Sequence, residues 1–211
     1  MTAGEAIVLV HGLWMPRQAC AILAWRLRRA GFSTTLFGYP TIHATLAENA
    51  QRLKRCVKSC AATRVHVVAH SLGGLVALQM LAHDPDPAIG RLVLLGSPVR
   101  GSAAARALAR HSAGRRLLGA GLLECMHAGF PIGPLPIDVG VIAGDVSLGL
   151  GRIMTLALPT PNDGAVGVSE TLLPWAADQI IVRASHSSML VSARVAQQTV
   201  RFLKFGKFLH A

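Results

Sequence analysis

Residues 65–74 read Val-His-Val-Val-Ala-His-Ser-Leu-Gly-Gly, and the apolar helical run Leu75–Ala82 follows them directly. The serine at position 71 should therefore lie on a sharp turn from a β-strand to a helix. On such a turn the hydroxyl is exposed, and the strand and the helix close up beside it. The residues two positions before and after the serine must be small, and here they are Ala69 and Gly73. The usual pattern has glycine at the first position, and Ala69 departs from it by one methyl group.

Two other interpretations of this stretch are open. An ordinary strand–turn–helix can hold a serine by chance. A membrane span is the second, because no Asp, Glu, Lys or Arg occurs from Val65 to His83. Three histidines, the Gly73-Gly74 pair and the division into a β-rich and a helical half argue against a span. A strand and a helix buried inside a sheet protein are just as apolar.

A length of 211 residues predicts one domain over residues 1–211, and strand-like and helix-like runs alternate along most of it. Hydrophobic residues make up 52% and charged residues 15% of the chain, so it can bury a substantial core. We expect an α/β fold with a mostly parallel, six-stranded open sheet and helices on both faces. The predicted strands are Glu5–Val10, Ser33–Phe37, Arg64–Ala69, Arg91–Leu95, Val139–Ala143 and Gln179–Val182. The predicted helices are Arg17–Ala30, Ala44–Cys60, the run that ends at His83, and Ser188–Phe205.

Residues 100–136 do not follow this alternation. They predict two short basic helices, Ala103–His111 and Arg115–His127, and then a Gly/Pro-rich loop, Gly129–Pro136. An insertion after the fourth strand would lie over the carboxyl ends of the strands, where open α/β sheets bind ligands. We therefore expect a short helical cap or lid over the substrate site. The alternative is a long surface segment without a functional role.

The net charge of +11 suggests nucleic acid as a binding partner, but the basic residues are scattered along the chain from Arg17 to Lys207. With one tyrosine and no stripe of aromatic and basic residues, we expect no nucleic-acid partner. An anionic lipid surface or an acidic substrate fits this charge better than a nucleic acid. Peripheral membrane contact would use the basic cap and the run Val200–Phe205, for which a helix packed on the core with solvated lysines is the favoured alternative. No basic leader precedes the strand that begins at Glu5, which predicts a cytoplasmic protein. Cys56 and Cys60 lack a second pair at metal-ligand spacing, so we expect structural thiols, no metal and no cofactor.

A serine nucleophile needs a base within hydrogen-bond reach, and His186 is the strongest candidate among nine histidines. It lies in the short loop Ala184–Ser188 between the last strand and the last helix. In a parallel sheet, that loop opens at the same edge as Ser71. His70 should point away from the neighbouring hydroxyl and act in packing.

The base needs a carboxylate to orient it. The candidates on strand-end loops are Asp138, Asp145, Asp163, Glu170 and Asp178. Asp163 is favoured, because the tight turn Pro161–Gly164 would hold it rigidly at the sheet edge. Asp145, at the end of the fifth strand, is the alternative.

Acyl transfer also needs N–H donors for the oxyanion of the tetrahedral intermediate. One would be the amide of Leu72, the residue after the serine, and the other the amide of Leu13 after the first strand. The turn there begins His11-Gly12, and Gly12 would let the backbone aim the Leu13 amide into the site. Trp14 would form part of the apolar wall of the substrate site.

With these segments in the order Ser, Asp, His, the chain resembles the α/β-hydrolase family, most closely its small bacterial lipases and esterases. The resemblance implies Ser71 as nucleophile, His186 as base, Asp163 as its partner, and the Leu13 and Leu72 amides as oxyanion donors. Many such lipases are secreted, and this chain shows no export signal.

We therefore expect a serine hydrolase that cleaves carboxylic esters through an acyl-enzyme intermediate. The substrate would be a small-molecule ester, and the apolar wall suggests a hydrophobic acyl chain. Two alternatives are a thioesterase or amidase with the same triad, and a non-catalytic domain that binds a lipid or a partner.

Overall fold

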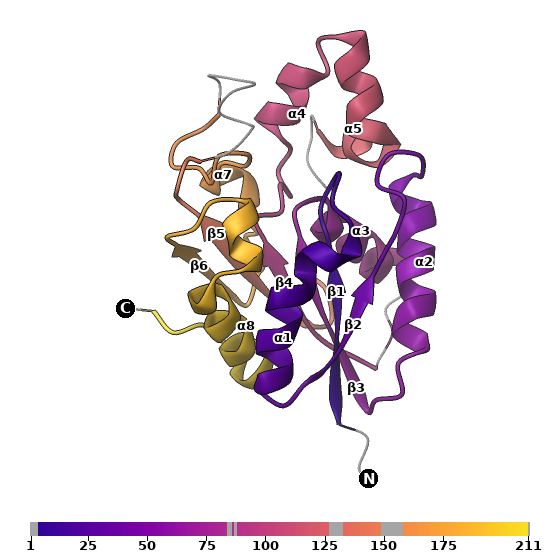
Figure 1. Ribbon diagram of the computed structural model, residues 1–211, viewed down its shortest axis with the longest axis vertical. Coiled ribbons are helices and arrows are strands. Elements are labelled where there is room, and N and C mark those ends of the chain that lie inside the picture. The colour runs from indigo at the N-terminus through magenta and orange to yellow at the C-terminus, as the bar shows by residue number, and fades with distance from the viewer. Residues whose placement is uncertain (1–3, 84–85, 87, 127–132, 149–157, 211) are drawn as a thin grey trace.

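Six parallel strands form one open sheet in a computed structural model that describes residues 4–83, 86, 88–126, 133–148 and 158–210 (Figure 1). The strand order is β2-β1-β3-β4-β5-β6, so β1 and β3 lie side by side near the middle. This sheet confirms the predicted fold, and every pair of neighbouring strands is parallel. The strands are β1 Glu5–Val10, β2 Ser33–Phe37, β3 Arg64–His70, β4 Ile89–Leu95, β5 Asp138–Gly144 and β6 Asp178–Val182.

Helices cover both faces of the sheet, and the alternation of side chains along β1 shows how. Ile7 and Leu9 point to one face, where they pack in a core that α1 and α8 complete. Val8 and Val10 point to the other face, which α2 and α3 cover. Figure 1 shows α1 and α8 together in front of the sheet, with α3 behind it. Because β1 is buried on both faces, it appears in the sequence as a continuous apolar run.

Capping side chains set helix boundaries that composition alone misplaces. Thr45 and Glu48 form a capping box, so α2 begins after Thr45, at Leu46. The hydroxyl of Ser192 caps α8, which separates this helix from the short turn η2 before it. The helices are η1 Arg17–Cys20, α1 Ala21–Arg29, α2 Leu46–Lys58, α3 Leu72–His83, α4 Ala103–Leu108, α5 Ser112–Cys125, α7 Val168–Thr171, η2 Ser187–Leu190 and α8 Ala193–Phe205.

The apolar stretch from Val65 to His83 is a buried strand followed by a buried helix. β3 lies between β1 and β4, and nine residues of α3 are buried. The membrane-span alternative is therefore wrong for this stretch. Among the described residues, no helix has the length and apolar character that crossing a bilayer requires.

The predicted insertion after β4 forms two helices, α4 and α5, at the carboxyl ends of the strands (Figure 1). α5 is interrupted at Gly119, whose φ of +72° lies in the left-handed region. The backbone of Ile42, in the connection after β2, leaves no room for a Cβ at Gly119. The amide of Ala120 donates to the carbonyl of Ile42, so α5 rests on that connection. Residues 127–132, including part of the predicted loop, lie outside the described residues.

Two phenylalanines on α8 provide a test of this packing. Phe202 is fully buried against the sheet, whereas 66% of Phe205 is exposed. Phe202→Ala should lower the free energy of unfolding by about 3–5 kcal/mol, because it leaves a cavity in the core. Phe205→Ala on the same helix should change it by no more than about 0.5 kcal/mol. Urea denaturation of both variants measures the difference, and equal losses would contradict the assigned faces of α8.

Candidate active site

Ser71 is the single residue between β3 and α3, and its backbone is strained. Its φ is +55°, in the left-handed region that residues other than glycine rarely adopt. Such a conformation costs on the order of 1–3 kcal/mol and persists only where the surroundings enforce it. Here the Ser71 amide donates to the carbonyl of Leu95 at 2.9 Å, which ties the turn to the end of β4. The predicted strand–turn–helix is therefore present, with the serine at its apex.

Small residues around Ser71 allow the elements to close up. A Cβ at Gly73 would lie 2.6 Å from the carbonyl oxygen of His11, and one at Gly74 would lie 2.6 Å from Cβ of Ser97. The first turn of α3 therefore packs directly on the loops that follow β1 and β4. Ala69 is fully buried within β3, where its methyl group belongs to the core. The core therefore accommodates the methyl group by which Ala69 differs from the usual glycine.

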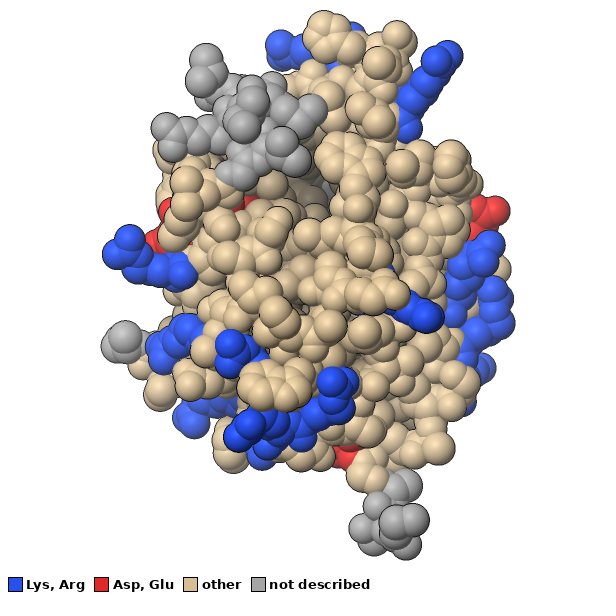
Figure 2. Space-filling view, viewed as in Figure 1, with Lys and Arg blue, Asp and Glu red and all other residues tan. Residues whose placement is uncertain are grey.

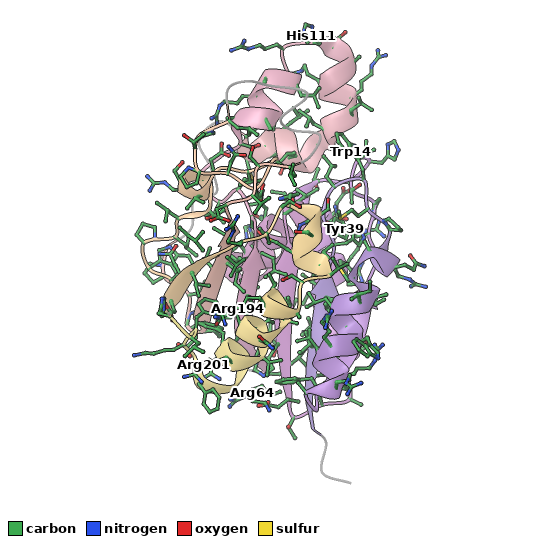
Figure 3. All side chains as sticks on the ribbon, turned by 60° about the vertical axis from the view of Figure 1, so that its left-hand side comes forward. Trp14, Tyr39, Arg64, His111, Arg194 and Arg201 are labelled. Atoms are coloured by element: carbon green, nitrogen blue, oxygen red, sulfur yellow. The ribbon has the colours of Figure 1, made fainter. Side chains whose placement is uncertain are left out.

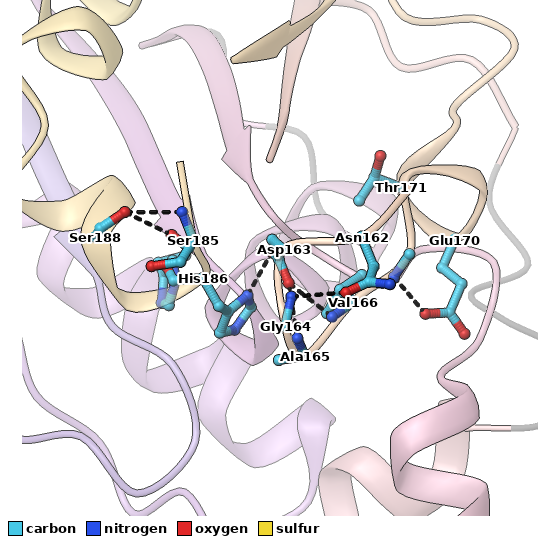
Figure 4. A network of polar contacts seen from close by, with 12 residues as sticks. Asn162, Asp163, Gly164, Ala165, Val166, Glu170, Thr171, Ser185, His186 and Ser188 are labelled. Atoms are coloured by element: carbon cyan, nitrogen blue, oxygen red, sulfur yellow. Dashed lines mark hydrogen bonds and ion pairs between the residues drawn. The ribbon is translucent and has the colours of Figure 1, made fainter. Parts of the chain in front are cut away.

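His186 and Asp163 form a direct pair at this edge of the sheet (Figure 4). Nδ1 of His186 lies 2.7 Å from Oδ2 of Asp163. The His186 amide also donates to the Asp163 carbonyl at 2.8 Å, so backbone and side chain join the two loops together. The turn after β4 lies against the pair, since a Cβ at Gly96 would be 2.9 Å from Oδ2 of Asp163.

The turn that carries Asp163 holds its carboxylate in one orientation. Oδ1 accepts the amides of Ala165 at 2.9 Å and Val166 at 2.7 Å, which leaves Oδ2 to the imidazole (Figure 4). The side chain of Asn162 closes the turn by accepting the amide of Gly164 at 3.0 Å. Asp163 is 1% exposed. A buried carboxylate with this set of donors can orient an imidazole.

The other predicted acids lie elsewhere. Asp145 is exposed just after β5, and among the described residues it makes no hydrogen bond to His186. Asp138 pairs with Arg91, the nitrogen and oxygen being 3.0 Å apart. Asp178 accepts from the His210 imidazole and from a backbone amide near the C-terminus. The structure thus brings Asp163, and not Asp145, to the imidazole.

Glu170 has a structural role that the sequence does not reveal. Its buried carboxylate accepts the amide of Gly167 at 2.8 Å through Oε2 and the amide of Ala103 at 2.6 Å through Oε1. Gly167 belongs to the Asp163 loop, and Ala103 is the first residue of α4. One side chain therefore links the acid-bearing loop to the insertion. Its partner at Ala103 is 67 residues away, so no local pattern could have indicated it.

His70 is the neighbour of the serine, and its imidazole binds the loop of His186. Its Nε2 lies 2.9 Å from the carbonyl oxygen of His186, and the two imidazole centroids are 4.5 Å apart. Because a carbonyl can only accept, Nε2 of His70 carries the proton and Nδ1 does not. Nδ1 is buried without a hydrogen-bond partner among the described residues. Burial, and secondly the neighbouring His186, lower the pKa of His70 to about 3, so its ring is neutral near pH 7.

The turn after β1 lies against the serine turn. A Cβ at Gly12 would lie 3.0 Å from Cβ of Ser71 and from Nδ1 of His70, which is tighter than most real Cβ contacts, so glycine lets the two turns approach closely. His11 is buried and stacks on the ring of Tyr39, with centroids 4.6 Å apart, and burial lowers the pKa of its imidazole. The Tyr39 hydroxyl donates to the His11 carbonyl at 2.8 Å. This buried stack fixes the strand end that precedes Leu13.

The predicted oxyanion donors belong to the first turn of α3 and to the loop after β1, which also carries Trp14. Leu72 is the first residue of α3, and Leu13 follows Gly12. Trp14 has a φ of +59°, and its indole N–H donates to the carbonyl of Leu117 on α5 at 2.9 Å. The loop that would supply one oxyanion donor is thereby attached to the insertion.

A histidine and two cysteines that were considered as functional candidates make ordinary structural contacts. His66 is buried in β3 and accepts the amide of Arg91 at 3.0 Å. The Cys60 thiol donates to the carbonyl of Cys56 at 3.3 Å, and both cysteines are free. Over the part of the chain that the structure describes, no group of three or more His, Cys, Asp or Glu is placed to hold a metal ion. His127 lies outside the described residues.

Comparison with known proteins assigns the family. The model of the alpha/beta hydrolase family matches residues 7–200, which is most of the chain. The chain therefore belongs to the alpha/beta hydrolase family, and its class is hydrolase, as the resemblance implied. No curated protein matches the sequence.

Solved structures with this fold include several bacterial ester hydrolases. The mature lipase BlEst2 of Bacillus licheniformis is similar at 20% identity and a TM-score of 0.76, over 96% of this chain and 91% of that one. A metagenomic carboxyl esterase is similar at 19% identity and a TM-score of 0.67, over 97% and 76% of the two chains. Carboxylesterase CesB of Bacillus subtilis is similar at 18% identity and a TM-score of 0.56, over 97% and 84%. At these identities the likeness shows the fold.

The neutral His70 predicts how stability depends on pH. Between about pH 6.5, the ordinary pKa of histidine, and about pH 3, the unfolded chain binds a proton at His70 that the folded protein does not. Stability should therefore fall as the pH falls through this window, by up to about 1.4 kcal/mol per pH unit from this group. His70→Gln keeps a donor near His186 but does not titrate, so its pH dependence should be shallower. Urea denaturation across this range compares the two proteins, and identical slopes would contradict the assignment.

Proposed function

We propose that this protein is a serine hydrolase that cleaves carboxylic esters through an acyl-enzyme. Ser71 attacks the acyl carbonyl while His186 takes its proton, and Asp163 holds the imidazole in the required tautomer. The amides of Leu13 and Leu72 stabilise the oxyanion. His186 then returns the proton to the leaving alcohol. Water, activated by the same imidazole, releases the acid and restores the serine.

The pairing of His186 with Asp163 is the observation that carries this proposal. At 2.7 Å the Asp163 carboxylate accepts the proton of Nδ1, so Nε2 is left unprotonated and able to act as a base. The strained turn at Ser71 is the second support, because an isolated strand–helix connection has no need of a φ of +55° at a serine. The ester bond is suggested by the relatives that are named lipases and carboxylesterases.

The proposed substrate is a small-molecule ester with an apolar acyl chain. Trp14 is 46% exposed and binds the backbone carbonyl of Leu117 on α5, a residue whose own side chain is 49% exposed. Large apolar side chains left exposed between the oxyanion loop and the insertion suit an acyl chain better than a charged one. In this proposal α4 and α5 act as the cap over the site. Thioesters and amides, cleaved by the same residues, remain the alternative substrates.

Ser71→Ala should reduce hydrolysis of p-nitrophenyl butyrate by at least about 10⁴-fold, because no other group supplies the nucleophile. The wild-type protein should also be labelled by a fluorophosphonate probe, and the variant should not. Circular dichroism of both proteins controls for folding. Undiminished turnover, or labelling that survives the substitution, would refute the mechanism. A folded wild-type protein that neither hydrolyses nor reacts would instead support a non-catalytic domain.

The two candidate acids give a matched pair of variants. Asp163→Asn should lower kcat by about 10⁴-fold, because the amide cannot hold the imidazole in the correct tautomer. Asp145→Asn removes the same charge from an exposed position and should leave kcat within about twofold of wild type. Steady-state kinetics with p-nitrophenyl butyrate tests both. The reverse order of effects would make Asp145 the triad acid.

A further inference from the structure

A basic and aromatic groove lies between α1 and α8, on the face of the sheet that these helices cover. Its volume is about 770 Å³. We call it the α1–α8 groove. Its charged and aromatic lining residues are Trp25, Arg26 and Arg29 from α1, and Arg201, Lys204 and Phe205 from α8. Figure 2 shows lysine and arginine side chains gathered over the lower part of this face.

The charge of this groove is not neutralised locally. No Asp or Glu lines it, and within the described part of the chain none of its Arg and Lys residues forms an ion pair. The two segments that build it, residues 6–47 and 179–211, contain no Asp or Glu at all. The groove therefore presents a concentrated positive potential, and its natural counterpart is a surface that carries many negative charges.

Exposed aromatic rings are interleaved with these cations. Trp25 is 47% exposed and Phe205 is 66% exposed, although both are large apolar side chains. The guanidinium of Arg29 lies 5.2 Å from the centroid of the Trp25 ring, and that of Arg201 lies 5.4 Å from the centroid of the Phe205 ring. Aromatic rings beside Arg and Lys are characteristic of protein surfaces at the boundary between lipid headgroups and acyl chains. A nucleic acid is a poorer fit, because a guanidinium covers a face of each ring that bases would need for stacking.

The groove is separate from the candidate active site. Trp25 lies at the middle of α1 and Arg29 at its end, and Arg201 and Phe205 lie in the second half of α8. α1 connects the parallel strands β1 and β2 and so runs back toward their amino ends, with this half of α8 across the groove from it, whereas Ser71 follows the carboxyl end of β3. In Figure 3, Arg201 lies near the lower end of the molecule and Trp14 lies near the insertion at the other end.

We propose that the α1–α8 groove docks the protein on an anionic phospholipid bilayer. Arg29, Arg201 and Lys204 contact lipid phosphates, while Trp25 and Phe205 enter the headgroup region. A protein bound in this way keeps the carboxyl edge of its sheet clear of the lipid. The docking does not depend on the ester chemistry proposed for Ser71.

Sedimentation with vesicles at low salt tests the docking. The wild-type protein should bind vesicles of equimolar phosphatidylglycerol and phosphatidylcholine, and not vesicles of phosphatidylcholine alone. Salt should release it, because exposed charges are screened beyond about 10 Å at 0.1 M ionic strength. The combined variant Arg29→Gln, Arg201→Gln and Lys204→Gln should bind about a hundredfold more weakly. Its circular dichroism spectrum should match that of the wild type, which shows that it is folded.

A second triple variant controls for net charge. Arg110→Gln, Arg115→Gln and Arg116→Gln remove three exposed charges from the insertion, at the other end of the molecule. This variant should keep most of the vesicle binding. Equal losses in both triple variants, or a larger loss in this one, would overturn the assignment to the groove.

Two further measurements complete the test. Ser71→Ala should bind vesicles as the wild type does, so a failure of the ester chemistry would leave the docking proposal intact. Fluorescence anisotropy with a labelled RNA and a labelled DNA duplex addresses the nucleic-acid alternative. Binding to either one without binding to anionic vesicles would overturn the proposal, as would the absence of binding to any of them.

Discussion

The chain turns from β3 into α3 over one residue, and this constraint shapes the whole edge of the sheet around it. Ser71 must adopt a left-handed backbone, and α3 must begin where β3 ends. The helix can do so only because Gly73 meets the backbone after β1 and Gly74 meets Ser97 after β4. Close packing at these two glycines draws the loops after three neighbouring strands to one point. A bulkier residue at either position would separate them.

Hydrogen bonds then connect the later loops to the same point. His70, at the end of β3, donates to the backbone of His186, and His186 donates to Asp163 through both its amide and its ring. Asp163 is held in turn by amides of its own loop. Each of these groups has its orientation set by more than one contact. These contacts fix the loops of His70, His186 and Asp163 relative to one another.

Much of the fold could be predicted, because buried parallel strands are continuous apolar runs and the turns between them are marked by glycine and proline. The serine turn, the His186 loop and the Asp163 turn could be located for the same reason. Contacts between distant segments could not be predicted. Glu170 looked like a possible catalytic acid until its partners at Ala103 and Gly167 were known. Likewise, the break in α5 at Gly119 depends on packing against Ile42, and the pattern of apolar residues in the sequence does not indicate such a distant contact.

The two ends of the α4–α5 insertion are attached to the body of the protein in unequal ways. At one end, a buried carboxylate from Glu170 joins α4 to the loop of Asp163. At the other, the carbonyl of Ile42 accepts the amide of Ala120 on α5, and the Trp14 indole donates to the carbonyl of Leu117. The loop after β1, the connection after β2 and the Asp163 loop therefore each give a hydrogen bond to the insertion, so a change in the length of any one of them would displace α4 or α5.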